Sequence, residues 1–249
     1  MEKTSELAKR IIIALDVRSK DDALLLIKQL DQAEIFKIGL RLFISEGPPL
    51  LKEIMDSGKK IFLDLKLHDI PNTVAEAVRA GVRHGVHMMT LHTSGGREML
   101  VRASEAAADE AEKEGRVKPL LLAVTVLTSL KSEELKQLGI PDDVEAQVLR
   151  LAKMARYEGM DGIVCSPLEI DVIKKEIGKD FTVVVPGIRP SWAVTHDQKR
   201  IMTPSQAIQK GADYLVVGRP ILEASSPQEA FLRILEELNR SGNCSHGKN

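Results

Sequence analysis

Residues 60–69 read Lys-Ile-Phe-Leu-Asp-Leu-Lys-Leu-His-Asp, an apolar run that ends in charged side chains. A short run of this kind is typical of a strand buried on both faces of a parallel sheet. Asp64 and Lys66 are two residues apart, so on a strand they share one face and the leucines beside them take the other. The charged face must then look onto a cleft, because buried charges are costly unless they are paired.

Similar apolar runs recur along the chain with helix-like segments between them. The predicted strands are Ile11–Asp16, Ile35–Gly39, Lys60–Leu67, Val86–His92, Leu120–Leu127, Gly162–Ser166, Thr182–Val185 and Tyr214–Val217. Apolar residues at three- and four-residue spacing predict helices over Asp21–Asp31, Pro48–Ser57, Asn72–His84, Gly96–Glu114, Val144–Tyr157, Pro167–Glu176, Pro204–Lys210 and Pro227–Asn239.

Eight strand–helix repeats without a break in composition favour an α/β fold of one domain, a closed (βα)8 TIM barrel over residues 1–240. A doubly wound open sheet is the alternative on pattern alone. The small polar residues 241–249 are expected to form a disordered tail.

The composition is that of an ordinary globular protein and excludes several classes. The chain has 249 residues, of which 43% are hydrophobic, and its net charge of −1 gives no sign of a nucleic-acid or membrane-surface partner. No apolar stretch reaches the roughly 18 residues of a membrane helix, and Met1–Arg10 lacks a secretory core. Cys165 and Cys244 are expected to be unpaired thiols, which favours a cytoplasmic location.

Polar residues gather at the carboxyl ends of the predicted strands, where barrels carry their catalytic groups. Lys37, on the strand beside Asp64 and Lys66, is the expected third member of a charged cluster, and Asp69 the fourth. Alternating lysine and aspartate would keep all four ionised. A purely structural ion-pair network is the alternative, but a lysine held there is also the group needed to protonate a carbanion.

Two strand ends carry features that suit a phosphate. Gly218-Arg219-Pro220 follows the last strand and opens a helix, and Arg189 follows the seventh. Barrels often bind phosphate at these two positions, and the long polar segment Pro190–Thr203 between them has the length of a lid. The alternative is a tight turn at Gly218 with solvated arginines.

No metal site is predicted. His84, His87 and His92 do not have the spacing of zinc ligands, and no cysteine joins them. No P-loop or Gly-rich dinucleotide turn is present. Trp192 is expected to be a packing anchor.

At this point the motifs resemble those of the orotidine 5'-phosphate decarboxylase family in its compact bacterial form. The resemblance rests on Asp64-Leu65-Lys66-Leu67-His68-Asp69-Ile70-Pro71-Asn72-Thr73 and runs from Ile11-Ile12-Ile13-Ala14-Leu15-Asp16 to Val217-Gly218-Arg219-Pro220. Three further segments match in order and spacing: Phe36-Lys37-Ile38-Gly39, Thr125-Val126-Leu127-Thr128-Ser129 and Pro186-Gly187-Ile188-Arg189.

The resemblance implies decarboxylation of orotidine 5'-monophosphate to UMP in pyrimidine biosynthesis, without a metal or cofactor. It implies that Lys66 protonates C6 of the pyrimidine and that Asp64 lies beside the departing carboxylate. The remaining implied site residues are Asp16 and Lys37 at the ribose, Thr128 at the pyrimidine, Arg189, Gln198, Gly218 and Arg219 at the 5'-phosphate, and Asp69, Ile70 and Thr73, which reach the site of a second subunit. The active unit is therefore expected to be a homodimer with shared sites.

Two alternatives remain open at the level of sequence. A sister barrel decarboxylase that acts on a sugar phosphate with Mg²⁺ shares Asp64, Lys66 and Asp69 by resemblance, whereas residues 70–73 and Thr128 favour the nucleotide enzyme. A silent phosphate-binding barrel is the other. One small departure from the family pattern is His196, where a more acidic residue is expected.

Overall fold

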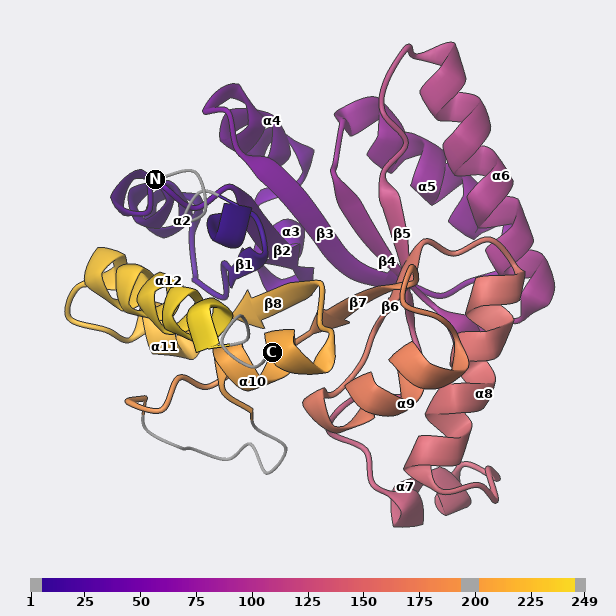
Figure 1. The fold of residues 1–249 in the computed structure, drawn as a ribbon. Coiled ribbons are helices and arrows are strands. Elements are labelled where there is room, and N and C mark those ends of the chain that lie inside the picture. Colours follow the sequence, from indigo (N-terminus) through magenta and orange to yellow (C-terminus); the bar gives the residue numbers. More distant parts are fainter. Residues whose placement is uncertain (1–5, 194–201, 245–249) are drawn as a thin grey trace. The chain divides into compact units, whose positions relative to one another are not determined.

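The computed structural model describes residues 6–193 and 202–244 (Figure 1). Eight strands follow one another around a closed barrel in the order β1 to β8, which confirms the predicted fold class. The strands are β1 (Ile11–Ala14), β2 (Ile35–Gly39), β3 (Lys60–Leu67), β4 (Met88–His92), β5 (Leu120–Val124), β6 (Gly162–Val164), β7 (Thr182–Val185) and β8 (Tyr214–Val217).

The helices alternate with these strands, as predicted. They are α2 (Lys20–Gln29), α3 (Leu40–Glu46), α4 (Pro48–Asp56), α5 (Pro71–His84), α6 (Arg97–Lys113), α7 (Ser132–Gln137), α8 (Val144–Tyr157), α9 (Ile170–Glu176), α10 (Pro204–Lys210), α11 (Arg219–Leu222) and α12 (Pro227–Cys244), with short 3₁₀ turns η1 (Thr93–Gly95) and η2 (Pro167–Glu169). Among the described residues, no helix has the length and apolarity needed to cross a membrane.

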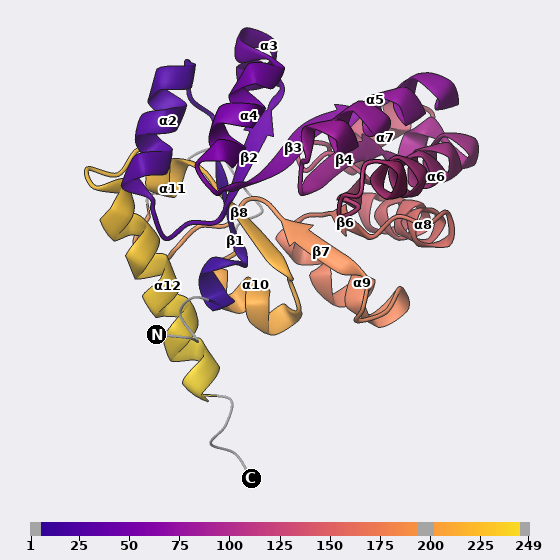
Figure 2. The same ribbon diagram turned by 90° about the horizontal axis from the view of Figure 1, so that it is seen from above.

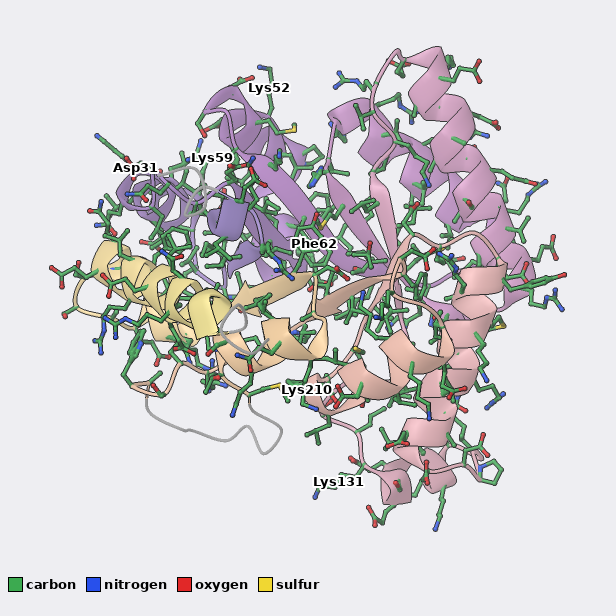
Figure 3. The ribbon with its side chains drawn as sticks, in the orientation of Figure 1. Asp31, Lys52, Lys59, Phe62, Lys131 and Lys210 are labelled. Carbon is green, nitrogen blue, oxygen red and sulfur yellow. The ribbon has the colours of Figure 1, made fainter. Side chains whose placement is uncertain are left out.

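The chain forms two compact units, the first made of residues 1–62 and 185–249 and the second of residues 63–184. In the first unit, β1 pairs in parallel with β2 and with β8. Helices α10 and α11 pack on α12, which also contacts α2. Figure 3 labels Lys59 and Asp31 of this unit, where the Lys59 ammonium donates to the Asp31 carbonyl at 2.5 Å and ties the start of β3 to the end of the α2 segment.

The second unit is built on parallel pairing of β4, β5, β6 and β7. Figures 1 and 2 show α5, α6 and α8 as neighbours in this unit, where α5 packs along α6 and α6 contacts α8. Their apolar faces are buried, as the spacing of Val74, Val78 and Val82 on α5 predicts. Cys165, beyond β6, is a free and fully buried thiol whose pKa is raised by that burial.

The structure adds elements that the pattern did not predict and moves several boundaries: β1, β4, β5 and β6 are each shorter than predicted. Helices α3 and α7 occupy segments for which no helix or strand was predicted. Both are short, with seven and six residues, so neither shows more than two turns of periodicity. Helix α12 ends at Cys244 instead of the predicted Asn239, although it contains Gly242 and Asn243, residue types that often follow the last turn of a helix. Residues 245–249 lie outside the described part.

Candidate active site

The charged pair predicted at the end of β3 is present. The Lys66 ammonium lies 2.9 Å from Asp64 Oδ1, and the side chains are 32% and 12% exposed. The carboxylate is therefore mostly withdrawn from water while the ammonium stays accessible. An ion pair in such a setting is screened less than one on the open surface. This geometry confirms that Asp64 and Lys66 project to the same side of the strand.

The backbone at Lys66 is unusual. Its φ is 52°, and among the described residues Lys66 is the sole non-glycine residue with positive φ. The left-handed region costs an L-residue with a Cβ about 1–2 kcal/mol, and such conformations persist where surrounding contacts hold them. The strand thus turns at the residue that carries the ammonium.

A threonine that the sequence did not single out joins this pair. Thr90 lies in the middle of β4 and is 1% exposed. Its hydroxyl accepts a hydrogen bond from the Lys66 backbone N–H at 2.9 Å and donates one to Asp64 Oδ1 at 2.9 Å. The signal in the sequence is one threonine between Met89 and Leu91, and a threonine in a strand is equally typical of a β-branched strand former.

Two histidines lie near the charged pair. The ring centroids of His68 and His92 are 5.3 Å apart. Burial lowers the pKa of His92, and electrostatic repulsion from His68 and Lys66 lowers it further, whereas Asp64 opposes the shift. This lowered pKa favours the neutral form of the His92 ring beside the lysine.

The residues that follow β3 lie on the surface of this unit. Asp69 and Thr73 are exposed, and Ile70 is 66% exposed, which is unusual for a large apolar side chain. Asp69 Oδ1 accepts the backbone N–H of Ile70 at 2.7 Å just before α5 begins. Thr128 is also exposed, in the turn closed by the hydrogen bond from Leu130 N to Leu127 O.

Asp16 and Lys37 meet in the first unit. The Lys37 ammonium lies 3.3 Å from Asp16 Oδ1, and the lysine side chain is 12% exposed whereas the aspartate is 64% exposed. The β1–β2 register supports this contact, since Leu15 N donates to Lys37 O at 3.0 Å. Gly39 leaves room for the ammonium, because a Cβ at that position would lie 3.2 Å from Lys37 Nζ.

Both predicted phosphate-binding arginines line one pocket of the first unit. The pocket has a volume of about 200 Å³ and is lined by Arg189, Trp192, Ala193, Arg219, Pro220, Glu223 and Ala224. Gly218 forms the N-cap of α11 just before Arg219, and a Cβ on it would lie 3.4 Å from the Ala14 Cβ and 3.6 Å from Asp16 Oδ2. Two guanidinium groups at one pocket make it suited to an anion.

Two of the residues that line this pocket, Arg189 and Trp192, are held by contacts with other segments. Arg189 is 7% exposed, and its backbone N–H donates to the Met202 carbonyl at 3.0 Å. Trp192 stacks under the Arg233 guanidinium, which lies 4.3 Å from the ring centroid. The expected role of Trp192 as a packing anchor fits this contact. Gln198, the remaining expected phosphate ligand, lies outside the described residues.

No metal-ligand cluster is found in the described residues: within 6–193 and 202–244, no group of three or more His, Cys, Asp or Glu side chains is placed to hold a metal ion.

Comparison with known proteins assigns the family. A sequence model described as "Orotidine 5'-phosphate decarboxylase / HUMPS family" matches residues 9–234. Orotidine 5'-phosphate decarboxylase of Nostoc sp. is 49% identical over 230 residues, which cover 92% of this chain and 97% of that protein. The protein of the same name from Trichlorobacter lovleyi is 48% identical over 234 residues, covering 94% of this chain and 96% of that one.

The solved structures agree with the sequence comparison. The crystal structure of orotidine 5'-phosphate decarboxylase from Lactobacillus acidophilus superposes with a TM-score of 0.83 at 37% identity and covers 93% of this chain and 99% of that one. The fold is thus shared across nearly the whole length of both chains. The chain belongs to the orotidine 5'-phosphate decarboxylase / HUMPS family.

Proposed function

We propose that this protein is an orotidine-5'-phosphate decarboxylase, a carboxy-lyase that forms UMP in pyrimidine biosynthesis and needs no cofactor. The observation that carries the proposal is the Lys66–Asp64 contact of 2.9 Å at the end of β3, in a chain almost half identical to relatives that bear this name. An accessible ammonium held by a shielded carboxylate is the group that this reaction needs.

In the proposed step, the bond between C6 and the carboxylate breaks and CO₂ leaves. The electron pair stays on C6, where the ring does not delocalise it. The Lys66 ammonium stabilises that charge as it forms and then gives its proton to C6, and water returns a proton to the amine. A charge fixed in advance stabilises the transition state without reorganising as the reaction proceeds, so it acts on kcat.

Asp64 has two roles in this proposal. Its hydrogen bond with Lys66 orients the ammonium. It also lies where it would repel the substrate carboxylate. That repulsion favours departure of CO₂ because it raises the energy of the bound substrate.

Binding is assigned to the remaining residues. Arg189, Arg219, Gly218 and Gln198 hold the 5'-phosphate in this scheme. The pocket that both arginines line supports the assignment of Arg189 and Arg219. Asp16 and Lys37, an ion pair at 3.3 Å, hold the ribose hydroxyls. Thr128 lies by the pyrimidine in this scheme. The energy of phosphate binding, remote from C6, serves to align the reacting groups.

The active unit is proposed to be a cytoplasmic homodimer in which Asp69, Ile70 and Thr73 complete the site of the partner subunit. Their exposure supports this assignment, above all that of Ile70. Mixing Asp69→Ala chains with Lys66→Ala chains, each inactive alone, is expected to restore part of the activity. Absence of rescue after confirmed subunit exchange would count against a shared site.

The decisive assay is loss of the absorbance of orotidine 5'-monophosphate in the presence of EDTA. Full turnover under chelation excludes the alternative decarboxylase that acts on a sugar phosphate with Mg²⁺. Lys66→Ala is expected to bind UMP and to lose turnover. Lys60→Ala is the matched control, because Lys60 begins the same strand and its side chain is 48% exposed against Glu34.

Two results would contradict the proposal. Near-normal CO₂ release by Lys66→Ala would remove the lysine from the role of proton donor. Tight UMP binding by the wild-type protein without any turnover would identify a silent phosphate-binding barrel.

A further inference from the structure

The Asp64–Lys66 pair is not held by its own contact alone. Thr90, on the neighbouring strand β4, contacts both residues with one hydroxyl group. The oxygen accepts the Lys66 backbone N–H, and the hydroxyl proton goes to Asp64 Oδ1, the same oxygen that accepts from the Lys66 ammonium. The three residues therefore form a closed ring of hydrogen bonds.

We propose that Thr90 is a positioning residue for the reaction, which fixes the Lys66 ammonium by holding both the lysine backbone and its carboxylate partner; this rests on the proposed function of the pair. Thr90 touches neither substrate nor reacting atoms in this scheme. It acts through Asp64 and Lys66.

The backbone of Lys66 explains why such a hold is needed. With φ of 52°, Lys66 leaves the regular strand conformation, and a left-handed residue needs contacts that favour it over the extended alternative. The hydrogen bond from its N–H to a threonine that is 1% exposed supplies one such contact from a rigid strand. Since the amide and the ammonium belong to one residue, fixing the amide limits where the ammonium can go.

Other buried threonines of the same unit do not make contacts of this kind. Thr93 and Thr125 are 0% and 5% exposed, and the hydroxyl of each has no hydrogen-bond partner among the described residues. A threonine hydroxyl that serves only the packing of this unit can thus remain unpaired. At Thr90 both the donor and the acceptor capacity are used on the candidate catalytic pair.

The test compares Thr90→Val with Thr93→Val, since both changes remove a buried hydroxyl and keep the β-branched shape. Thr90→Val is expected to lower kcat by about 10- to 100-fold, the range that a small misplacement of a reacting group causes. The Kd for UMP should stay within about threefold of the wild-type value, because the Thr90 hydroxyl does not contribute to ligand binding in this scheme. Thr93→Val should keep wild-type kcat, because removing an unpaired hydroxyl leaves no partner unsatisfied.

Thr90→Ser distinguishes a positioning role from a packing role, because only a positioning role predicts that serine restores kcat. Serine keeps the hydroxyl and loses the methyl group, so kcat should return to within about threefold of wild type even where the melting temperature falls. Valine should show the opposite combination, with near-normal packing and low kcat. If Thr90→Val does not fold, Thr90→Ser against Thr90→Ala makes the same comparison.

Three outcomes overturn the proposal: Thr90→Val with wild-type kcat, equal losses in Thr90→Val and Thr93→Val, or serine no better than valine or alanine. Each of these leaves the proposed function standing as long as the wild type turns over and Lys66→Ala does not. Failure of the wild type to decarboxylate the nucleotide overturns the proposed function instead.

Discussion

Replacing Arg233 with methionine tests whether the stack on Trp192 supports the anion pocket. Methionine keeps an unbranched apolar stem over the ring and removes the charge. Arg233 is exposed and its guanidinium lies 4.3 Å from the ring centroid, so the lost cation–π interaction is at the lower end of its range, about 0.5–1 kcal/mol. If the stack holds Trp192 at the pocket, losing that energy should raise the Kd for UMP about two- to fivefold over the wild-type value.

Fluorescence makes the measurement direct, because Trp192 is the single tryptophan of the chain and lines the pocket. Titration with UMP gives the Kd, and a thermal melt gives the separate effect on stability. That effect should be about 1–4 °C in melting temperature, given about 2–4 °C per kcal/mol for a chain of this size. Arg240→Met is the matched control, because Arg240 lies on the same helix as Arg233. Its side chain is 84% exposed, and its guanidinium lies 3.7 Å from a carboxylate oxygen of Glu236.

A clear refutation is available. If Trp192 emission changes in Arg233→Met, so that the stack is known to be broken, but the Kd for UMP equals that of Arg240→Met, the stack does not support the pocket. A fall in melting temperature without a change in Kd leads to the same conclusion, because it makes the contact a contribution to stability alone.

Three further predictions concern the second unit. Gly162→Ala should destabilise the fold by about 3 kcal/mol, seen as a lower melting temperature, because its Cβ would lie 2.3 Å from the Thr182 carbonyl oxygen. Glu110→Gln should lower the free energy of unfolding above about pH 4.5, because the hydrogen bond with Arg83 depresses the pKa of Glu110. Denaturant titrations measure this difference from wild type. The difference should disappear as the pH falls through that lowered pKa, because the wild-type carboxyl is then also neutral. His92 should titrate below the usual 6.5 in an NMR pH series, because burial lowers its pKa; a value above 6.5 would contradict the described packing.

Much of the barrel can be predicted from the sequence because its strands are short apolar runs bounded by charge. β2, β3, β7 and β8 have the predicted bounds. The Asp64–Lys66 contact is also the one that the spacing predicts, although the φ of Lys66 departs from the regular strand geometry on which that prediction rests. The hydrogen bonds from Thr90 to this pair cannot be predicted from spacing, because a helix separates Thr90 from the pair in the sequence. In the sequence, Thr90 also resembles any other β-branched strand residue.

Other features depend on three-dimensional context that periodicity does not carry. The positive φ of Lys66 has no signal, because lysine is not a residue that favours that region. The pairing of Lys37 with Asp16 needs the register of β1 against β2. Arg233 lies on the last helix, 41 positions beyond Trp192, and nothing in the sequence links the two.

The left-handed backbone at Lys66 also bears on how this protein can be redesigned. Glycine adopts that conformation without the Cβ penalty, so Lys66→Gly should be more stable than Lys66→Ala by about 1 kcal/mol, and a search guided by stability alone would tend to discard the lysine. Stabilised libraries of this barrel should therefore keep position 66 fixed, together with Thr90. Under the proposed function, the ammonium at position 66 justifies this cost in stability.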